Sequence, residues 1–187
     1  MNPKTEKLES LEERKAEVLI KLRAYKLIKK QKHDDAISYL VDMPKEKQKA
    51  LIWCIPGEAT VGVASINRLT KLMKDQEIEN GLIVTDGRYT HTVKAGAKKK
   101  NVELLPKTFP AFNLFENKSV PKHEILTEEQ QQQLITKYKI HPYQLPQISS
   151  QDPAAKVIGA KPGDVVRVIR KSSTAGEHIA YRYVVEQ

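Results

Sequence analysis

The sequence predicts an α+β protein with two parts, an N-terminal α/β domain and a small C-terminal α+β module. In the first part, apolar runs at 50–55 and 81–85 flank a stretch of helical periodicity at 63–74, the strand–helix–strand order of an α/β unit with parallel strands. In the last third, a capped helix precedes two segments rich in β-branched residues. Because composition and charge change near residue 120, we expect domains at 1–120 and 121–187.

The first element predicted in the chain is a helix over residues 6–32. Val18, Leu22 and Tyr25 recur at helical spacing, with Leu11 one heptad before Val18, and Lys and Glu fill the other faces. Lysines crowd the end of this stretch, where the helix dipole favours cations. The pattern is typical of a solvated amphipathic helix.

The remaining N-terminal elements are shorter. Residues 50–55 form a continuous apolar run that Pro-Gly at 56–57 ends, which is typical of a buried strand. We expect a second helix over 63–74, a strand over 81–85 and a further strand at 111–115. Read locally, Asp86-Gly87 between two β-rich stretches also predicts a two-residue hairpin turn.

The C-terminal part has its own signals. Thr127, followed three residues later by Gln130, fits a capping box at the start of a helix. A short helical turn is expected at 154–158, between prolines and a β-rich segment at 164–170. Residues 178–185 alternate cleanly between two faces, as a strand does. A compact module with a small sheet follows.

Composition limits the function classes. Lys and Arg number 32 against 23 Asp and Glu, so the net charge of +9 favours a polyanionic partner such as nucleic acid. Most of the excess lies in residues 1–121, with 23 basic and 16 acidic residues, whereas residues 122–187 hold nine and seven. The positive charge that favours a polyanionic partner therefore lies mainly in the N-terminal part of the chain.

The expected cellular compartment follows from sequence features that are missing. The single Cys54 cannot form an internal disulfide and excludes every Cys-based zinc pattern. No apolar stretch approaches the roughly 20 residues of a membrane span, and the N-terminus has no signal-peptide core. We expect a reducing compartment, cytosol or nucleus, and no secretion.

Catalytic motifs are weak. The P-loop, the dinucleotide-binding glycine pattern and the Gly-x-Ser-x-Gly elbow are all missing from the sequence. His33-Asp34-Asp35 could offer metal ligands, but adjacent residues of a helix point to different sides. Asp86 with Lys94 could in principle form a Mg²⁺-dependent phosphodiester-cleaving pair. Neither set identifies an enzyme.

Two further segments have both a structural and a functional interpretation. The densest basic cluster, Lys94 and Lys98–Lys100 with Arg88 upstream, is either a solvated face or a phosphate-contacting one. Residues 159–164 and 170–176 are rich in Gly, Pro, Ser and Thr, which suits turns beside strands and equally suits a docking loop for a larger partner.

The C-terminal motifs resemble a known family. The matching segments, in order and spacing, are 121–126, 144–146, 152–153, 159–166, 170–176 and 181–182. Here the chain resembles the fifth subunit shared by eukaryotic nuclear RNA polymerases I, II and III and its counterpart in archaeal RNA polymerase. The first 120 residues resemble the eukaryotic N-terminal jaw domain more loosely.

The jaw resemblance rests on four short segments. Leu22-Arg23-Ala24-Tyr25 stands where that domain has Arg-Gly-Tyr at a helix end, and 61–63 and 82–84 match a Val-Gly-Val and a strand. Residues 90–94 read Thr-His-Thr-Val-Lys where the family has Thr-Pro-Ser-Ala-Lys. The proline is absent and Val replaces Ala. Because this loop leads into a helix in the family, the resemblance favours a helix over the hairpin.

The resemblance implies a non-catalytic subunit of a multisubunit DNA-directed RNA polymerase, without catalytic residues, cofactor, metal, membrane or small-molecule substrate. Its C-terminal module would dock on the largest subunit among other polymerase subunits, and its jaw would lie beside downstream duplex DNA. The expected nucleic-acid-binding residues are Arg88, Thr90, His91, Lys94 and Lys98. The expected partner-binding residues are His123, Pro146, Asp152, Pro153, Gly159, Gly163, Arg170, Ser172, Thr174, Gly176, Tyr181 and Arg182.

Two rivals stay open at this point. One is a free-standing basic nucleic-acid-binding transcription regulator that keeps the fold, and the other is a divergent nuclease in the α/β region. The sequence also leaves open the source, and with it the compartment: nucleus if eukaryotic, cytoplasm if archaeal, viral factory or virion if viral.

Overall fold

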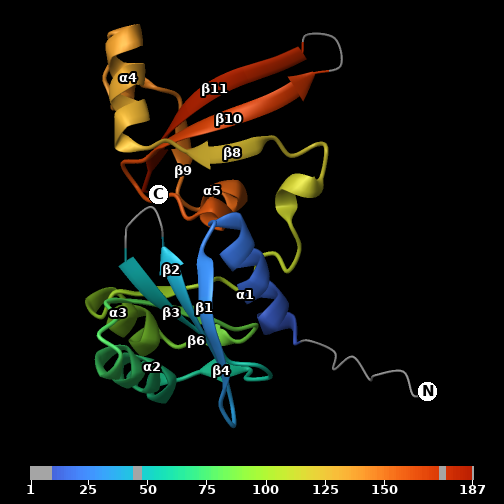
Figure 1. Cartoon of the computed structure of the whole chain (residues 1–187), viewed down its shortest axis with the longest axis vertical. Coiled ribbons are helices and arrows are strands. Elements are labelled where there is room, and N and C mark those ends of the chain that lie inside the picture. The colour runs from blue at the N-terminus through green and yellow to red at the C-terminus, as the bar shows by residue number, and fades with distance from the viewer. Residues whose placement is uncertain (1–9, 44–47, 173–175, 187) are drawn as a thin grey trace, which may run out of the picture. The chain divides into compact units, whose positions relative to one another are not determined.

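The computed structural model describes residues 10–43, 48–172 and 176–186. The chain divides into two compact units, Met1–Phe112 and Asn113–Gln187. Figure 1 shows the elements of each unit. Helices and strands both contribute to each unit, so the predicted α+β class is confirmed. Within the described ranges, no helix is both long and apolar enough to cross a membrane.

The first unit is built on a five-stranded mixed sheet. Its strands lie in the order β1 (Lys26–Lys32), β2 (Ile37–Met43), β3 (Gln48–Cys54), β5 (Asn80–Val84) and β7 (Val102–Leu104). The first three pair antiparallel, whereas β3, β5 and β7 are parallel. The strands expected at 50–55 and 81–85 and their parallel arrangement are therefore confirmed.

Two helices make the crossovers of the parallel half. Helix α2 (Val63–Asp75) links β3 to β5 and buries Ile66, Leu69 and Met73, as its 3.6-residue periodicity predicts. Helix α3 (His91–Lys99) links β5 to β7 and buries Val93 and Ala97. These side chains form one core with strand residues such as Trp53 and Ile83.

The interpretation of 86–93 as a hairpin is wrong. The two-residue strand β6 (Arg88–Tyr89) pairs in parallel with β4 (Thr60–Val61), and helix α3 follows it. Gly87 is needed because a Cβ there would collide with the carbonyl oxygen of Glu58. The glycine thus allows a close approach of two backbones instead of a hairpin turn.

The predicted helix over 6–32 is only partly right. Helix α1 (Leu11–Leu22) starts with a capping box between Ser10 and Glu13 and ends where Ala24 adopts φ 54°. The lysine-rich remainder is strand β1, which pairs antiparallel with β2. Because β1 is an edge strand, its exposed lysines protect the edge from unwanted pairing.

Three other features differ from the expectation. Strand β2 was not predicted, although it buries most of its side chains as a central strand, and β7 was not predicted either. The strand expected at 111–115 is wrong, because a 3₁₀ turn, η1 (Leu114–Glu116), forms under an Asn113 cap.

The second unit holds a four-stranded sheet in the order β8 (Lys122–Ile125), β10 (Val165–Ser172), β11 (Gly176–Val185) and β9 (Gln147–Ser149). Strand β10 is antiparallel to β8 and β11, and β9 is parallel to β11. Helix α5 (Pro153–Ile158) packs Ile158 on Val166, Val168 and Val184.

Outside this core, helix α4 (Glu128–Tyr138) begins with the predicted capping box of Thr127 and Gln130. The 3₁₀ turn η2 (Pro142–Gln144) follows it. The helical turn expected at 154–158 and the strands expected at 164–170 and 178–185 are confirmed.

Candidate functional site

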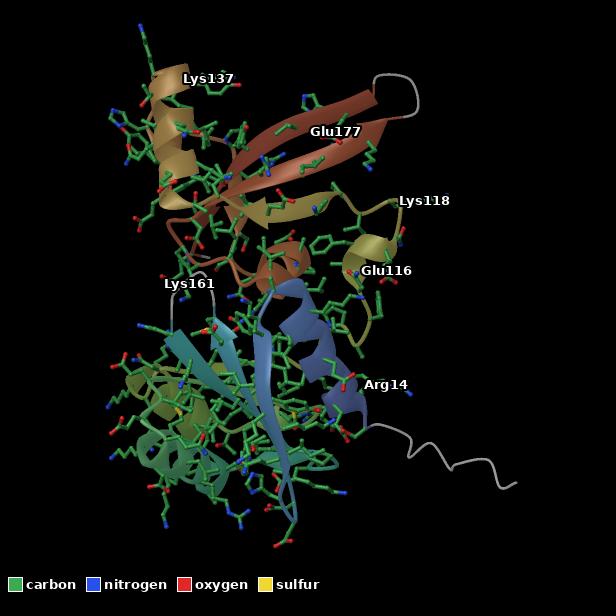
Figure 2. All side chains as sticks on the ribbon, in the orientation of Figure 1. Arg14, Glu116, Lys118, Lys137, Lys161 and Glu177 are labelled. Carbon is green, nitrogen blue, oxygen red and sulfur yellow. The ribbon has the colours of Figure 1, made fainter. Side chains whose placement is uncertain are left out.

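The structure gathers four of the expected partner-binding residues around one pocket of the second unit. His123, Asp152, Arg170 and Arg182 line a pocket of about 300 Å³. The remaining lining residues are Pro121, Gln147, Ile148 and Val168. All four strands of the second unit's sheet contribute residues to the pocket. Figure 2 shows side chains on both faces of this sheet.

Strand register explains why these side chains share one face of the sheet. Val168 faces His123 across β8 and Ala180 across β11, so these three share one face of the sheet. Because β10 and β11 are antiparallel, Arg170 and Arg182 lie on opposite sides of the Val168–Ala180 pair, each two residues from it, and both project to the same face. This is the face on which α5 packs, and the pocket shares Ile148 and Val168 with its core.

Asp152 has a structural task at the edge of the pocket. Its Oδ1 accepts hydrogen bonds from the backbone N–H groups of Ala154 (2.8 Å) and Ala155 (3.3 Å), which caps α5. Pro153 occupies the first turn of that helix. The Asp-Pro pair of the sequence motif is thus a helix start.

The other expected partner-binding residues shape the backbone nearby. Gly159 ends α5 with φ 77°, Gly163 precedes β10 with φ 99°, and Gly176 opens β11 with φ 73°. The carbonyl oxygen of Pro146 accepts the N–H of Tyr183 at 2.9 Å. Tyr181, half-buried, projects to the opposite face from the pocket. Thr174 and the side chain of Ser172 lie outside the described residues.

An ion-pair network on that opposite face was not predicted. Glu124 bonds both Lys122 (2.7 Å) and Arg167, whose Nε lies 3.1 Å away. The hydrogen bond from Lys122 and that from Arg167 hold the pKa of the Glu124 carboxyl below its usual value. Only the alternation of β8 and β10 could have indicated this pairing.

In the first unit, helix α3 brings three of the expected nucleic-acid-binding residues together. His91, Lys94 and Lys98 lie three and four residues apart and are exposed, while Val93 and Ala97 are buried on the other side. Thr90 caps the helix, its Oγ1 accepting the N–H of Val93 at 3.4 Å. Exposed Arg88 belongs to β6 and precedes this helix.

A second basic cluster lies beside α3; it joins Lys100 of the predicted cluster to two lysines of α2 that were not predicted. Lys71, Lys74 and Lys100 line a shallow depression with Asn67 and Thr70. Lys100 Nζ donates to Asn67 Oδ1 at 2.9 Å. Among the described residues, none of the three lysines is paired with a carboxylate. Helices α2 and α3 thus carry two neighbouring groups of lysines.

The two weak catalytic candidates have protein partners. His33 packs on Trp53 with ring centroids 4.7 Å apart and bonds Ser38, and Asp35 pairs with Arg68. Asp86 Oδ1 accepts from Lys15 Nζ at 3.1 Å, and Lys107 approaches Oδ2 at 3.6 Å. The hydrogen bond from Lys15 lowers the pKa of Asp86. Asp86 therefore pairs with Lys15 and Lys107 and not with Lys94.

The single cysteine is a packing residue. Burial raises the pKa of the Cys54 thiol, which keeps it protonated and unreactive. Within the part of the chain that the structure describes, no three His, Cys, Asp or Glu side chains come together as metal ligands.

Comparison with known proteins agrees with the two-part architecture. Residues 112–184 match the family model described as RNA polymerase Rpb5, C-terminal domain. Residues 6–112 match a model described as NACHT-associated inactive Restriction Endonuclease 1.

Individual relatives are RNA polymerase subunits. The subunit Rpo5 of Pyrococcus abyssi is 55% identical over 75 residues, which are 40% of this chain and 92% of that protein. The subunit RPABC1 of polymerases I, II and III from Caenorhabditis elegans is 34% identical over 134 residues, 70% of this chain and 64% of its own. The Dictyostelium discoideum counterpart is 35% identical over 136 residues, 70% of this chain and 69% of its own. With the sheet, the capped helices and the glycine turns of the motif in place, these matches show that the chain belongs to the Rpb5 family of DNA-directed RNA polymerase subunits.

Proposed function

We propose that this chain acts as a non-catalytic polymerase subunit whose second unit docks on the largest subunit and whose first unit lies near downstream duplex DNA. The observation that carries the proposal is the distribution of charge and motif between the units. The second unit has ten basic and eight acidic residues, a net charge of +2, and it contains the family's motifs. The first has 22 and 15, a net charge of +7.

The basic unit supports the DNA-facing half of the proposal. His91, Lys94 and Lys98 share an exposed helix face, and Lys71, Lys74 and Lys100 cluster beside it. Lysines without carboxylate partners are free to bind phosphates, and such contacts carry little sequence information. A subunit beside a moving duplex needs that property.

Site-specific photo-crosslinking tests both halves. A photoreactive residue replacing exposed Thr92 on α3 should crosslink downstream DNA in an assembled transcription complex. The same residue replacing Tyr181 should crosslink the largest subunit. DNA crosslinks from position 181 with none from position 92 would contradict the proposed orientation.

A direct cleavage assay tests the alternative that the chain is a nuclease. We expect the purified chain to leave labelled duplex DNA intact in the presence of Mg²⁺, because Asp86 is held by two lysines. Cleavage that Asp86→Ala abolishes would contradict the proposal. A free-standing regulator would bind DNA but would not be retained in the polymerase.

A further inference from the structure

Two arginines and one carboxylate line the pocket of the second unit, so its lining has an excess of positive charge. Arg170 and Arg182 line it, and neither has a carboxylate partner among those residues. Arg182 makes one long hydrogen bond, from Nη1 to the carbonyl oxygen of Gln147 at 3.5 Å. Each guanidinium has five N–H donors, so most of them remain open to a ligand.

Arg167 on the same strand provides the contrast. It projects to the opposite face, where Glu124 accepts hydrogen bonds from its Nε and Nη2. The fold therefore supplies a carboxylate to the arginine on one face of β10 and none to Arg170 on the other. Arg170 is exposed, so its guanidinium is open to an acceptor from a partner.

His123 adds an oriented polar group. Its Nδ1 lies 2.8 Å from the carbonyl oxygen of Pro121, which can only accept, so Nδ1 carries a hydrogen and this bond fixes the orientation of the ring. The ring stacks on Phe115 with centroids 5.9 Å apart. The imidazole is thus held in place before any ligand arrives.

The lining selects among anions. Pro121, Ile148 and Val168 give the pocket apolar walls, which suit the methylene groups of an acidic side chain. Asp152 stands at the same pocket, and the unit as a whole has a net charge of only +2. Asp152 repels a row of backbone phosphates more strongly than a single carboxylate, which brings one negative charge to the two arginines.

We propose that this pocket binds a carboxylate side chain from an acidic segment of a partner polypeptide, held by Arg170 and Arg182. The inference rests on the proposed function, because it names the chemistry by which the second unit docks. The planar fork of arginine binds a carboxylate with two parallel hydrogen bonds, which fixes orientation as well as affinity.

Charge reversal in the full-length tagged subunit tests the pocket. Arg170→Glu with Arg182→Glu should reduce recovery of the other polymerase subunits at least tenfold, and Arg170→Lys with Arg182→Lys should have a smaller effect. Lys137→Glu with Lys118→Glu changes charge equally within the same unit at residues that do not line the pocket, on α4 and after η1 (Figure 2), and should leave recovery unchanged. Thermal unfolding of each full chain shows whether the variant folds.

A second measurement identifies the ligand. A photoreactive residue replacing Pro121, which lines the pocket, should crosslink a polypeptide segment containing Asp or Glu. Changing that acid to Lys should restore recovery of the doubly reversed subunit. Crosslinks to nucleic acid, to a segment without acidic residues, or full recovery of a folded reversed variant would each overturn the inference. Failure of the unaltered subunit to recover polymerase would instead contradict the proposed function.

Discussion

Lys15 Nζ lies 3.1 Å from Asp86 Oδ1, although 71 positions separate the two residues in the chain. The lysine side chain is only 4% exposed, and its ammonium group also donates to the carbonyl oxygen of Lys107 at 2.7 Å. The ion pair ties the first helix to the loop that follows β5. Asp86 therefore compensates a buried charge, a role that explains its presence without catalysis.

The first prediction concerns this ion pair. Asp86→Asn should lower the midpoint of thermal unfolding by several degrees, because Lys15 is then left buried without a countercharge. Asp75→Asn, an exposed change on α2, should have no comparable effect. Equal midpoints for Asp86→Asn and the parent would show that the pair does not stabilise the fold.

The same pair predicts a pH dependence. The hydrogen bond from Lys15 lowers the pKa of Asp86 in the folded chain, so the folded state binds this proton less readily than the unfolded state. The stabilisation is present at neutral pH and should be lost as the pH falls below about 4, the carboxyl's ordinary pKa. Urea unfolding of parent and Asp86→Asn at pH 7 and at lower pH checks this. A stability difference that grows on acidification would contradict the sign.

The end of α1 predicts a stabilising substitution. Ala24 adopts φ 54°, a conformation that costs an L-residue about 1–2 kcal/mol. Ala24→Gly removes this cost, but glycine loses more conformational entropy than alanine on folding. The net effect should be a rise in the free energy of unfolding of about 0.5–1 kcal/mol. Exposed Ala95 on α3 provides the control, because Ala95→Gly should cost about 1 kcal/mol. Chemical denaturation compares the two, and a destabilising Ala24→Gly would be contradictory.

The cap of α5 predicts a modest loss. Asp152→Ala removes the acceptor of two backbone N–H groups and should lower the free energy of unfolding by about 1 kcal/mol. Asp152→Asn keeps an oxygen at Oδ1 and should retain most of the stability. Chemical denaturation of the two variants measures the difference, and equal losses would mean that the side chain acts through its charge and not as a cap.

The exposed face of α3 predicts a salt-dependent effect. Lys94→Gln with Lys98→Gln should weaken binding of duplex DNA by the full chain and lower the slope of log affinity against log salt by about 2. Fluorescence anisotropy across a salt series measures this. Lys118→Gln with Lys137→Gln removes the same charge from the second unit, and equal slopes for both double variants would refute the assignment.

Local patterns were enough for much of the fold. The amphipathic spacing of Ile66, Leu69 and Met73 predicts α2, and the Thr127 capping box predicts α4. Strand β1 could not be identified in this way, because its lysine-rich sequence is a strand only through pairing with β2. The Asp86-Gly87 pair wrongly predicted a hairpin turn. Gly87 is required because the backbone there passes close to the backbone of Glu58, a contact that only the tertiary structure creates.

The candidate site could also be predicted only in part. Alternation along 178–185 assigns Arg182 to a face, and the family motif singles out Arg170. Their meeting with His123 and Asp152 depends on the order β8-β10-β11-β9, which brings distant segments together. The partnership of Lys15 and Asp86 likewise depends on a contact between residues far apart in sequence, for which no local pattern gives a signal.

A polymerase subunit must be found in the polymerase. The most direct test is tagged purification of the full chain from its native source in moderate salt, with quantitative mass spectrometry of the co-purifying proteins. We expect the two largest subunits of an RNA polymerase at one copy each per copy of this chain. Recovery of the chain alone, or with nucleic acid only, would contradict this role and would mean that the family's fold persists here without its function.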